Sequence, residues 1–564
     1  MALTLNTPGV YIEEVPTLPS SVVAVPTSIP VFIGYTAKAN INGVPLGFPS
    51  PPTRITSMLD FQTIFGGAYE ESFTVTLSGS DVEVSPALVY NSGKDFTLFY
   101  QMQMYFANGG GPCYIIAVDD YDGTITALDM QTSIELAEQI DEITLVVVPE
   151  AMSVNVTDAD RKGIYDAMLA HCAVMKDRFA VLDVETRGTS IADDANKFRN
   201  LNVGANNLSY GAAYYPPFSA TLSYYYTDAG VDIIALNPNL PANVQAFDGV
   251  TLDVVNNGNG VNAITTVNFT GLFTAPLPNN TFIIINGVSI DISGAVDISE
   301  VMSAINIDPS IGSLINLTNT LDDLTITAVN ANYPMSVSVT VVSPGIPPPL
   351  EAIAPDKALY SRIQTALSAF PLTLYPSSTM VGIYAAVDND RGVWKAPANV
   401  GVALVSSLNE NVKNDEQGGL NVDPSSGKSI NVIRRFDGRG ILVWGARTLE
   451  GNSNEWRYIS VRRLFLFIED SCKHASEFVV FEPNDKNTWV RVKGMITNFL
   501  TSLWRDGALA GSKPEQAFYV RVGLGETMSA QDILEGKLIV QIGIAAVRPA
   551  EFIILQFEHK LQEA

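Results

Sequence analysis

Positive charge, cysteine and histidine are all scarce in this sequence. Its 564 residues hold 33 Lys and Arg against 59 Asp and Glu, a net charge of −26. Because phosphate binding depends on Lys and Arg, this balance argues against nucleic acid or anionic lipid as a general partner. Cys113, Cys172 and Cys472 are far apart and odd in number, which fits neither a disulfide framework nor a CxxC metal pair. We therefore expect reduced, packed thiols and folding in a cytoplasm.

Signatures of catalysis are also missing. His171, His474 and His559 are the only histidines, and none has the spacing of a zinc site or a catalytic triad. Residues 425–429 imitate the end of a phosphate-binding loop, but Val422 stands where its first glycine belongs. Paired carboxylates are expected in so acidic a chain. We expect no enzyme, with no catalytic, metal-binding or cofactor-binding residues and no cofactor.

Long apolar runs are absent as well. No stretch approaches the ~20 apolar residues of a membrane span. Residues 1–21 contain no Lys or Arg and no apolar core of a signal peptide. We expect neither a signal, nor an anchor, nor insertion into a membrane.

What the sequence does contain is unevenly distributed. Residues 1–370 hold 12 Lys and Arg against 37 Asp and Glu, net −25, whereas residues 371–564 hold 21 against 22, net −1. All five tryptophans lie in the second part, at 394, 444, 456, 489 and 504. Tryptophan-rich, weakly charged surfaces are typical of contacts with other proteins, whereas an acidic body faces solvent. The function is therefore sought in the last third.

A chain of this length exceeds one core and predicts several domains. A strand, helix and strand at 145–149, 158–176 and 180–184 indicate an α/β layer. No Lys or Arg occurs between Arg199 and Lys357, where Val, Ile and Thr alternate with Asn-Gly turns, including an expected strand at 250–255. We interpret residues 235–345 within this stretch as an inserted β-domain, after which a helix at 356–370 resumes the interrupted layer.

The last third shows tighter alternation. Residues 458–461 are expected to form a strand and 462–475 a helix. A second helix is predicted over 488–505, with an apolar face and with Arg491, Lys493 and Arg505 on or near the other face. Strands at 518–522, 537–545 and 551–557 would complete a small sheet.

Together these patterns predict an α/β and α+β multidomain fold with an α+β C-terminal domain and extended terminal arms. The expected segments are 1–25, an N-terminal arm; 26–100, the first part of the core and outer body; 101–234, an α/β middle domain; 235–345, the inserted all-β outer domain; 346–375, the return helix of the middle domain; 376–548, the C-terminal core domain; and 549–564, a C-terminal strand.

Several strings in the last third resemble one family in order. They include Arg391-Gly392-Val393-Trp394-Lys395-Ala396-Pro397-Ala398-Asn399 and the segments 375–378, 382–388, 431–434, 444–449, 458–463, 481–484, 507–509 and 549–552. The start at 8–14 matches too, although Ala386 stands where many members have arginine. These strings resemble the contractile tail sheath proteins of myophages, R-type pyocins and extracellular contractile injection systems.

The resemblance implies a structural protein that polymerises as hexameric rings or helical strands around an inner tube and contracts to drive the tube through a target envelope. It implies assembly in a bacterial cytoplasm, within a phage tail or a released or cell-attached particle. The implied partners are further copies, the inner tube protein, and baseplate and terminator or cap proteins, with no nucleic acid.

In such sheaths both terminal arms are lent to neighbouring subunits, a form of β-augmentation. The implied exchange residues here are Val10, Tyr11, Ile12, Glu13, Phe552, Ile553, Ile554 and Leu555. The resemblance also implies a tube contact in the last third, which we assign to Arg491, Lys493 and Arg505. Two alternatives remain at this point: a component of a type VI secretion sheath, and a carbohydrate-binding tail protein whose tryptophans would line a sugar site.

Overall fold

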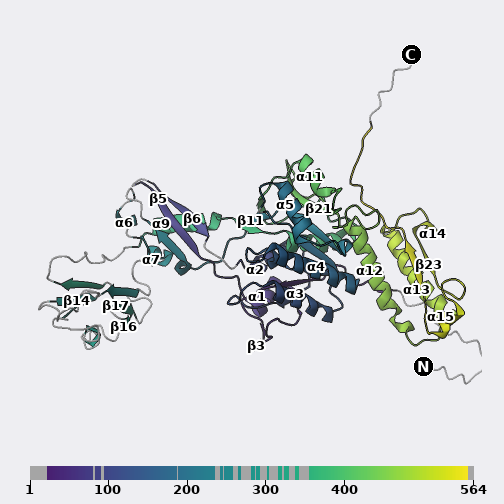
Figure 1. Ribbon diagram of the computed structural model, residues 1–564, viewed down its shortest axis with the longest axis horizontal. Helices are drawn as coiled ribbons and strands as arrows, with labels where there is room; N and C mark the ends of the chain where they lie inside the picture. The colour runs from purple at the N-terminus through teal and green to yellow at the C-terminus, as the bar shows by residue number, and fades with distance from the viewer. Residues whose placement is uncertain are drawn as a thin grey trace, which may run out of the picture. The chain divides into compact units, whose positions relative to one another are not determined.

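The computed structural model (Figure 1) describes residues 22–556 apart from 81–82, 91–94, 187, 236–239, 241, 246, 258–263, 269–280, 286–287, 292–300, 304–314, 321–322, 329–336 and 342–354. The described chain forms two compact units. Unit 1 takes its residues from Met1–Tyr69, Lys94–Leu222 and Thr373–Ala564, and unit 2 from Glu70–Gly93 and Ser223–Leu372. The exchange residues Val10, Tyr11, Ile12 and Glu13 lie outside the described residues.

An eight-stranded sheet is the centre of unit 1. Its order is β22 (Gly440–Val443), β21 (Ile430–Phe436), β10 (Gly211–Tyr215), β9 (Phe179–Asp183), β8 (Leu145–Val147), β1 (Pro30–Gly34), β7 (Cys113–Ala117) and β4 (Thr53–Ile55). The six inner strands are parallel and the two edge strands antiparallel. Strands β1, β7 and β9 are buried at every position, as expected when helices cover both faces of a parallel sheet.

Helices α3 (Ala127–Leu136) and α4 (Asp158–Met175) cover the face toward which Val31 and Ile33 point. Helices α2 (Leu98–Ala107) and α10 (Ser377–Arg391) cover the other face, where the Phe32 and Tyr105 rings lie 4.9 Å apart. The unit β8-α4-β9 has parallel strands, which confirms the predicted βαβ pattern. The three cysteines are buried and free, also as predicted.

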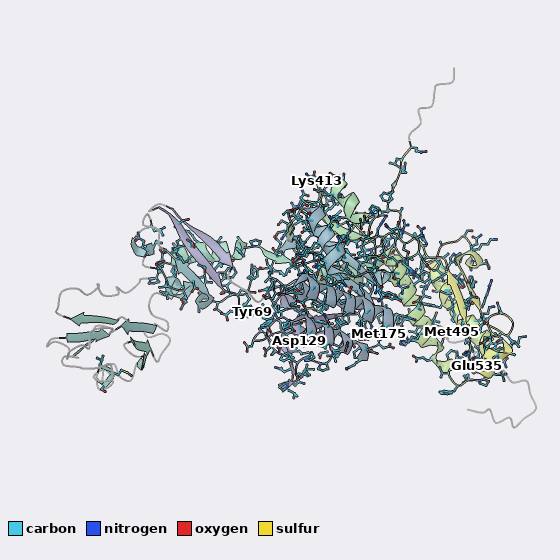
Figure 2. All side chains as sticks on the ribbon, in the orientation of Figure 1. Tyr69, Asp129, Met175, Lys413, Met495 and Glu535 are labelled. Carbon is cyan, nitrogen blue, oxygen red and sulfur yellow. The ribbon has the colours of Figure 1, made fainter. Side chains whose placement is uncertain are left out.

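The C-terminal part of unit 1 is built on two long helices, α12 (Ile459–Ser476) and α13 (Lys486–Arg505). The Asp485 side chain caps α13 by accepting from the backbone of Asn487 and Thr488. Met495 is buried in the core between these helices (Figure 2). The predicted strand at 458–461 is wrong, because Ile459 begins α12 and its apolar side chains follow helical spacing.

The predicted boundary at 376 does not separate two domains. Strands β21 and β22 join the same sheet as β10, and α10 packs on α2. Residues 376–548 therefore share a compact unit with 101–222 instead of forming their own. Pairing between distant strands leaves no mark in the local pattern that set the boundary.

Unit 2 contains the sheet β12 (Val231–Ile234), β5 (Phe73–Ser80) and β6 (Glu83–Tyr90). Helix α9 (Lys357–Ala369) shares a core with this sheet through Leu359, Ile363 and Leu367, so it does not return to the layer of unit 1 as predicted. The expected strand at 250–255 is also wrong, since α7 (Leu252–Asn257) occupies it.

The inserted segment has the predicted strand chemistry. Two antiparallel three-stranded sheets lie there, β13-β17-β16 and β15-β14-β18. Their strands are β13 (Ile264–Asn268), β14 (Thr281–Ile285), β15 (Val288–Asp291), β16 (Ile315–Thr320), β17 (Asp323–Ala328) and β18 (Val337–Val341). Because α6 (Ala242–Gln245) and α7 also lie within residues 235–345, the segment is not all-β as predicted.

Smaller elements complete the described chain. They are α1 (Met58–Phe65), α5 (Ile191–Lys197), α6 (Ala242–Gln245), α11 (Asn414–Asn421), α14 (Pro514–Ala517), α15 (Ala530–Leu534), β2 (Asn40–Ile41), β3 (Val44–Pro45), β11 (Phe218–Ala220), β19 (Leu372–Leu374), β20 (Val405–Leu408), β23 (Phe518–Arg521) and β24 (Gln541–Ile544). Among the described helices, none has the length and apolar character needed to cross a membrane.

Candidate assembly site

The end of the described chain is an extended apolar segment. Phe552, Ile553, Ile554 and Leu555 are 74, 78, 83 and 73% exposed, and they form no strand with this chain. Of the strand expected at 551–557, residues 551–556 are therefore not paired as a strand within the described chain. Four consecutive large apolar side chains in water are unfavourable, and such exposure marks a surface that meets another protein.

A buried arginine fixes the root of this segment, which we call the tail (residues 552–556). Arg447 holds both carboxylate oxygens of Glu551, with its Nε 3.0 Å from Oε1 and its terminal nitrogen 2.6 Å from Oε2. Asn421 Nδ2 donates to the same carboxylate at 2.6 Å. Desolvation raises the pKa of Glu551, but the hydrogen bonds from Arg447 and Asn421 outweigh it and leave the pKa below its usual value. The tail thus leaves the body from a fixed point.

The small sheet of the C-terminal part has open edges. β23 and β24 pair only with each other among the described strands, with Phe518 opposite Ile544 and Arg521 opposite Gln541. A two-stranded sheet is marginal by itself, and its free edges expose unpaired donors and acceptors. This sheet can therefore accept further strands.

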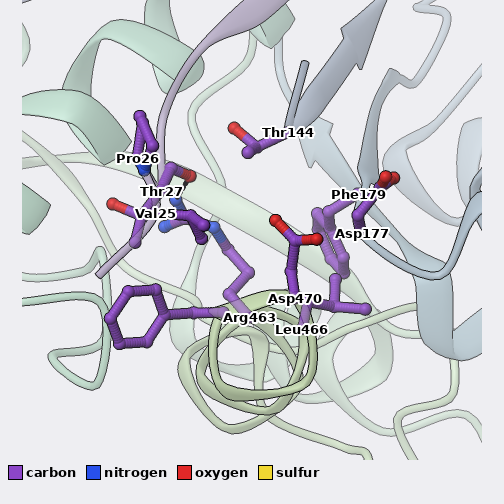
Figure 3. A pocket seen from close by; sticks show the side chains of 10 residues that line it. Val25, Pro26, Thr27, Thr144, Asp177, Phe179, Arg463, Leu466 and Asp470 are labelled. Carbon is purple, nitrogen blue, oxygen red and sulfur yellow. Dashed lines mark hydrogen bonds between the residues drawn. The ribbon is translucent and has the colours of Figure 1, made fainter. Parts of the chain in front are cut away.

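The N-terminal segment is fixed to the body where it enters. Thr27 Oγ1 donates to Asp388 Oδ2 at 2.7 Å, and Arg463 donates to the carbonyl of Thr27 at 2.8 Å. Arg463 and Asp388 form an ion pair at 2.5 Å with both side chains only 4% exposed. Figure 3 shows Thr27 and Arg463 at a small cavity of about 10 Å³ between the N-terminal segment and α12. The ion pair thus connects α10, α12 and the entering chain.

The entering chain continues along α12. The Val25 amide donates to Ser471 Oγ at 3.3 Å, and Val22 is buried in the core of α12 and α13. Residues 22–27 therefore follow the helix for about two turns, the spacing from Arg463 to Ser471. The described chain thus begins at Val22 in the core of α12 and α13.

Arg462 attaches α12 to the rest of unit 1. Its guanidinium lies 4.2 Å from the Tyr210 ring centroid and 4.5 Å from that of Trp456, and the residue is buried. Stacking between two rings suits the flat, weakly hydrated guanidinium. This contact gives Trp456 a structural role in place of a sugar-binding one.

The three basic residues predicted to contact a tube are exposed on α13, but they do not gather into one patch. Val492, Ile496 and Leu503 form the buried stripe. At 3.6 residues per turn, Arg491 and Lys493 lie on opposite flanks of that stripe, and Arg505 lies on the Arg491 side about four turns away. The Arg491 guanidinium lies 5.1 Å from the Phe478 ring centroid.

Sequence reasoning missed the residues that fix the two arms: Thr27, Asp388, Arg447, Arg463 and Glu551. Four of them, all but Thr27, lie inside the family-like strings, so the strings themselves were the available signal. The structure also shows what surrounds Ala386, which stands where many members of the resembled family have arginine. A Cβ atom at Gly109 would lie 2.7 Å from the Ala386 Cβ, so α10 approaches the end of α2 very closely there.

The remaining candidates are structural. Lys428, in the loop that imitates a phosphate-binding loop, is buried and donates to the carbonyls of Val203 and Arg199. His171 contacts Arg178, and desolvation followed by that positive charge lowers its pKa to about 4. Among the described residues, no cluster of three His, Cys, Asp or Glu could hold a metal ion.

An ionic cluster joins the last turn of α12 to the loop before β8. His474 Nε2 lies 2.8 Å from Asp141 Oδ2, and its Nδ1 lies 3.1 Å from Asp470 Oδ1. Lys473 and Asp177 are the other charged groups that face this cluster. The hydrogen bond to the Asp470 backbone raises the pKa of His474 most. Desolvation lowers that pKa, but the hydrogen bond to the Asp141 carboxylate raises it further, so the pKa stays above its ordinary value.

This cluster predicts a pH dependence. Because the folded-state pKa of His474 lies above its ordinary value, its stabilisation is present below pH 6.5 and is lost as pH rises through the raised pKa. We expect His474→Gln to lower the free energy of unfolding by less than about 1 kcal/mol at low pH, given partial exposure and screening. The difference from wild type should vanish at alkaline pH in urea titrations. A difference independent of pH would contradict this role.

Comparisons with known proteins point in one direction. Residues 452–560 match the model of the phage tail sheath C-terminal domain. The tail sheath protein of Vibrio phage KVP40 is 23% identical over 179 residues, which are 32% of this chain and 25% of that relative. The matched stretch thus spans a quarter of the curated relative.

Solved structures cover nearly the whole chain. The helical sheath of the anti-feeding prophage in its contracted state is 27% identical, with a TM-score of 0.55 over 99% of this chain and 100% of that one. A chain of its sixfold-symmetrised baseplate is also 27% identical, with a TM-score of 0.54 over the same shares. The contracted sheath of PVC, an extracellular contractile injection system, is 25% identical with a TM-score of 0.53 over 99% of each chain. Over nearly its whole length the chain is therefore similar to sheath and baseplate chains of contractile particles, and residues 452–560 match a tail sheath C-terminal domain.

Proposed function

We propose that this chain polymerises around an inner tube, as stacked hexameric rings or helical strands, and contracts to drive the tube through a target envelope. The observation that carries the proposal is the exposed tail, Phe552 to Leu555, which is rooted at Arg447 and pairs with no described strand of its own subunit. A monomer gains nothing from such a segment, whereas a polymer buries it at every joint.

The tail and the open sheet are complementary. An added strand would satisfy the free edge of β23 or β24 and cover the tail's apolar side chains. The residues Val10, Tyr11, Ile12 and Glu13 are proposed to add a second strand from another copy, since the chain enters beside this same part of unit 1. Fixed roots at Glu551 and Thr27 would let each joint turn without losing its partner.

The experiment that tests the function is electron microscopy of the assembled particle. The chain, expressed with its tube and baseplate proteins, should form striated tubes that exist in a long and a short state. Baseplate and terminator or cap proteins are proposed as partners at the two ends, with assembly in the bacterial cytoplasm. Particles without any striated sheath would overturn the proposal.

Unit 2 is proposed to form the outer surface of the sheath. It carries 16 Asp and Glu against 2 Lys and Arg, a net charge of −14, so about half of the chain's net −26 lies there. Such a charge keeps a long polymer soluble and discourages association between sheaths. The inserted strands β13–β18 are proposed to be an accessory part of this surface.

The tube contact is proposed to lie on α13, and the position of its basic residues sharpens the test. Since Arg491 and Lys493 flank the buried stripe on opposite sides, only one of the two flanks can face a tube. We expect either Arg491→Glu or Lys493→Glu, but not both, to give sheath that lacks a tube, because each exposed pair is weak but repeats along the polymer. Tube-filled particles at wild-type yield from both variants would rule α13 out.

A further inference from the structure

Two arginines lie over two aromatic rings at the β21–β22 hairpin, and a third arginine, Arg435, lies between Arg434 and Phe436 in the sequence. Arg434 and Arg439 lie 5.4 and 5.7 Å from the Phe436 ring centroid, and Arg439 also lies 5.7 Å from that of Trp444. The two rings are 4.6 Å apart. Arg435 and Arg439 are exposed, and both rings are only half-buried. We call Arg434, Arg435, Phe436, Arg439 and Trp444 the hairpin patch.

Within the described chain, no carboxylate pairs with the positive charges of this patch, and their hydrogen-bond acceptors are uncharged. Arg434 donates to the amide oxygens of Asn414 and Gln417, at 2.8 and 2.7 Å. Arg435 donates to the carbonyl of Ser406 at 2.8 Å, and Arg439 to the amide oxygen of Asn399. All of these acceptors are neutral.

Carboxylates are close in sequence but not in contact. Asp437 lies in the turn, yet no carboxylate of the described residues lies within 4.0 Å of the three guanidinium groups. Buried Arg434 Nε has no hydrogen-bond acceptor among the described residues. Elsewhere in unit 1, by contrast, Arg161, Arg447 and Arg463 each hold a carboxylate.

Arginine and aromatic side chains together are the composition of protein interface centres. The rings hold the guanidinium groups of Arg434 and Arg439, and a carbonyl holds that of Arg435, so little side-chain freedom is lost when a partner binds. Neutral acceptors fix their direction without cancelling their charge. The patch is therefore preorganised for an acidic protein surface.

We propose that the hairpin patch binds the acidic unit 2 of a neighbouring copy of this chain. The arginines of the patch and the acidic unit 2 have complementary charge, since unit 2 has a net charge of −14. A polymer brings many copies of unit 2 close to every patch. This inference rests on the proposed polymerisation but goes beyond it, because the strand joints involve neither the patch nor unit 2. It adds an ionic contact that depends on salt.

Photo-crosslinking in the assembled sheath tests this contact. A photo-crosslinking amino acid in place of exposed Asp437, at the tip of the hairpin, should link to residues 70–93 or 223–372 of another copy, as mapped by mass spectrometry of crosslinked peptides. Sheath formation by this variant tests the proposed function separately. Crosslinks to the tube protein or to unit 1, or none in well-formed sheath, would overturn the proposal.

Charge reversal supplies the matched test. Arg435→Glu/Arg439→Glu should reduce the crosslink or the sheath yield about tenfold, a change of about 1.4 kcal/mol. The control Lys38→Glu/Lys513→Glu makes the same charge change at two exposed lysines that form no ion pair in the described chain. It should change the crosslink and the sheath yield by less than about twofold. Circular dichroism confirms folding of both. Equal effects of the two double variants would refute the patch.

Discussion

Deleting residues 552–564 should abolish polymerisation while leaving a folded, soluble subunit. The tail contributes nothing to the core of its own subunit, because Phe552 to Leu555 are more than 70% exposed. In a polymer each of these side chains would contribute about 1.5–3 kcal/mol when fully buried, so the loss per joint is on the order of 5 kcal/mol or more. Sedimentation and electron microscopy would detect the loss, and thermal unfolding would show an unchanged midpoint.

Two substitutions distinguish backbone strand pairing from nonspecific hydrophobic association. Ile554→Pro keeps an apolar side chain but removes a backbone donor, so it should impair assembly nearly as much as the deletion. Leu128→Asp removes a comparably exposed apolar side chain from α3, 69% exposed, and should leave assembly intact. Assembly by the proline variant at wild-type yield would mean that the tail does not pair as a strand.

The second large effect is expected at the Arg463–Asp388 pair. Asp388→Ala would leave a buried guanidinium without its carboxylate, which costs about 3–5 kcal/mol of unfolding free energy. Thr27 would lose its acceptor as well, so the segment 22–28 should become accessible to proteases. Urea denaturation and limited proteolysis measure the two effects.

Asp390→Ala is the matched control. Asp390 lies two residues further along α10, is exposed, and forms no ion pair within the described chain. Its replacement should change the unfolding free energy by less than about 0.5 kcal/mol. An apolar pair, Asp388→Leu/Arg463→Met, should recover much of the stability without restoring the contact to Thr27. Equal destabilisation by Asp388→Ala and Asp390→Ala would contradict the role of the pair.

Local patterns predict the elements whose causes are local. The βαβ unit around α4, the capped helix α13 and the free cysteines follow from spacing, capping residues and cysteine count. The composition of residues 458–461 favours a strand because Tyr, Ile and Val are common in strands, but their side chains continue the apolar stripe of α12. Packing against α13 favours the helical spacing of 3.6 residues over the two-residue spacing of a strand.

Contacts between distant segments are not predictable in the same way. Nothing in residues 430–443 reveals that they extend a sheet begun at Pro30, and nothing in α9 shows that it packs with β5 and β12. The candidate assembly site also has a part that the sequence predicts and a part that it does not. The tail can be found because an apolar strand pattern is local, whereas its anchor joins Arg447 to Glu551 across 104 positions. Only the family-like strings point to these anchor residues.

The central claim is that the tail completes a sheet in another copy. A cryo-electron microscopy map of the assembled sheath, at a resolution that traces the backbone, tests it most directly. Residues 552–555 should run as a strand hydrogen-bonded to the free edge of β23 or β24 in a neighbouring subunit. If those residues instead pair within their own subunit, or stay unpaired in the polymer, assembly by strand exchange is contradicted.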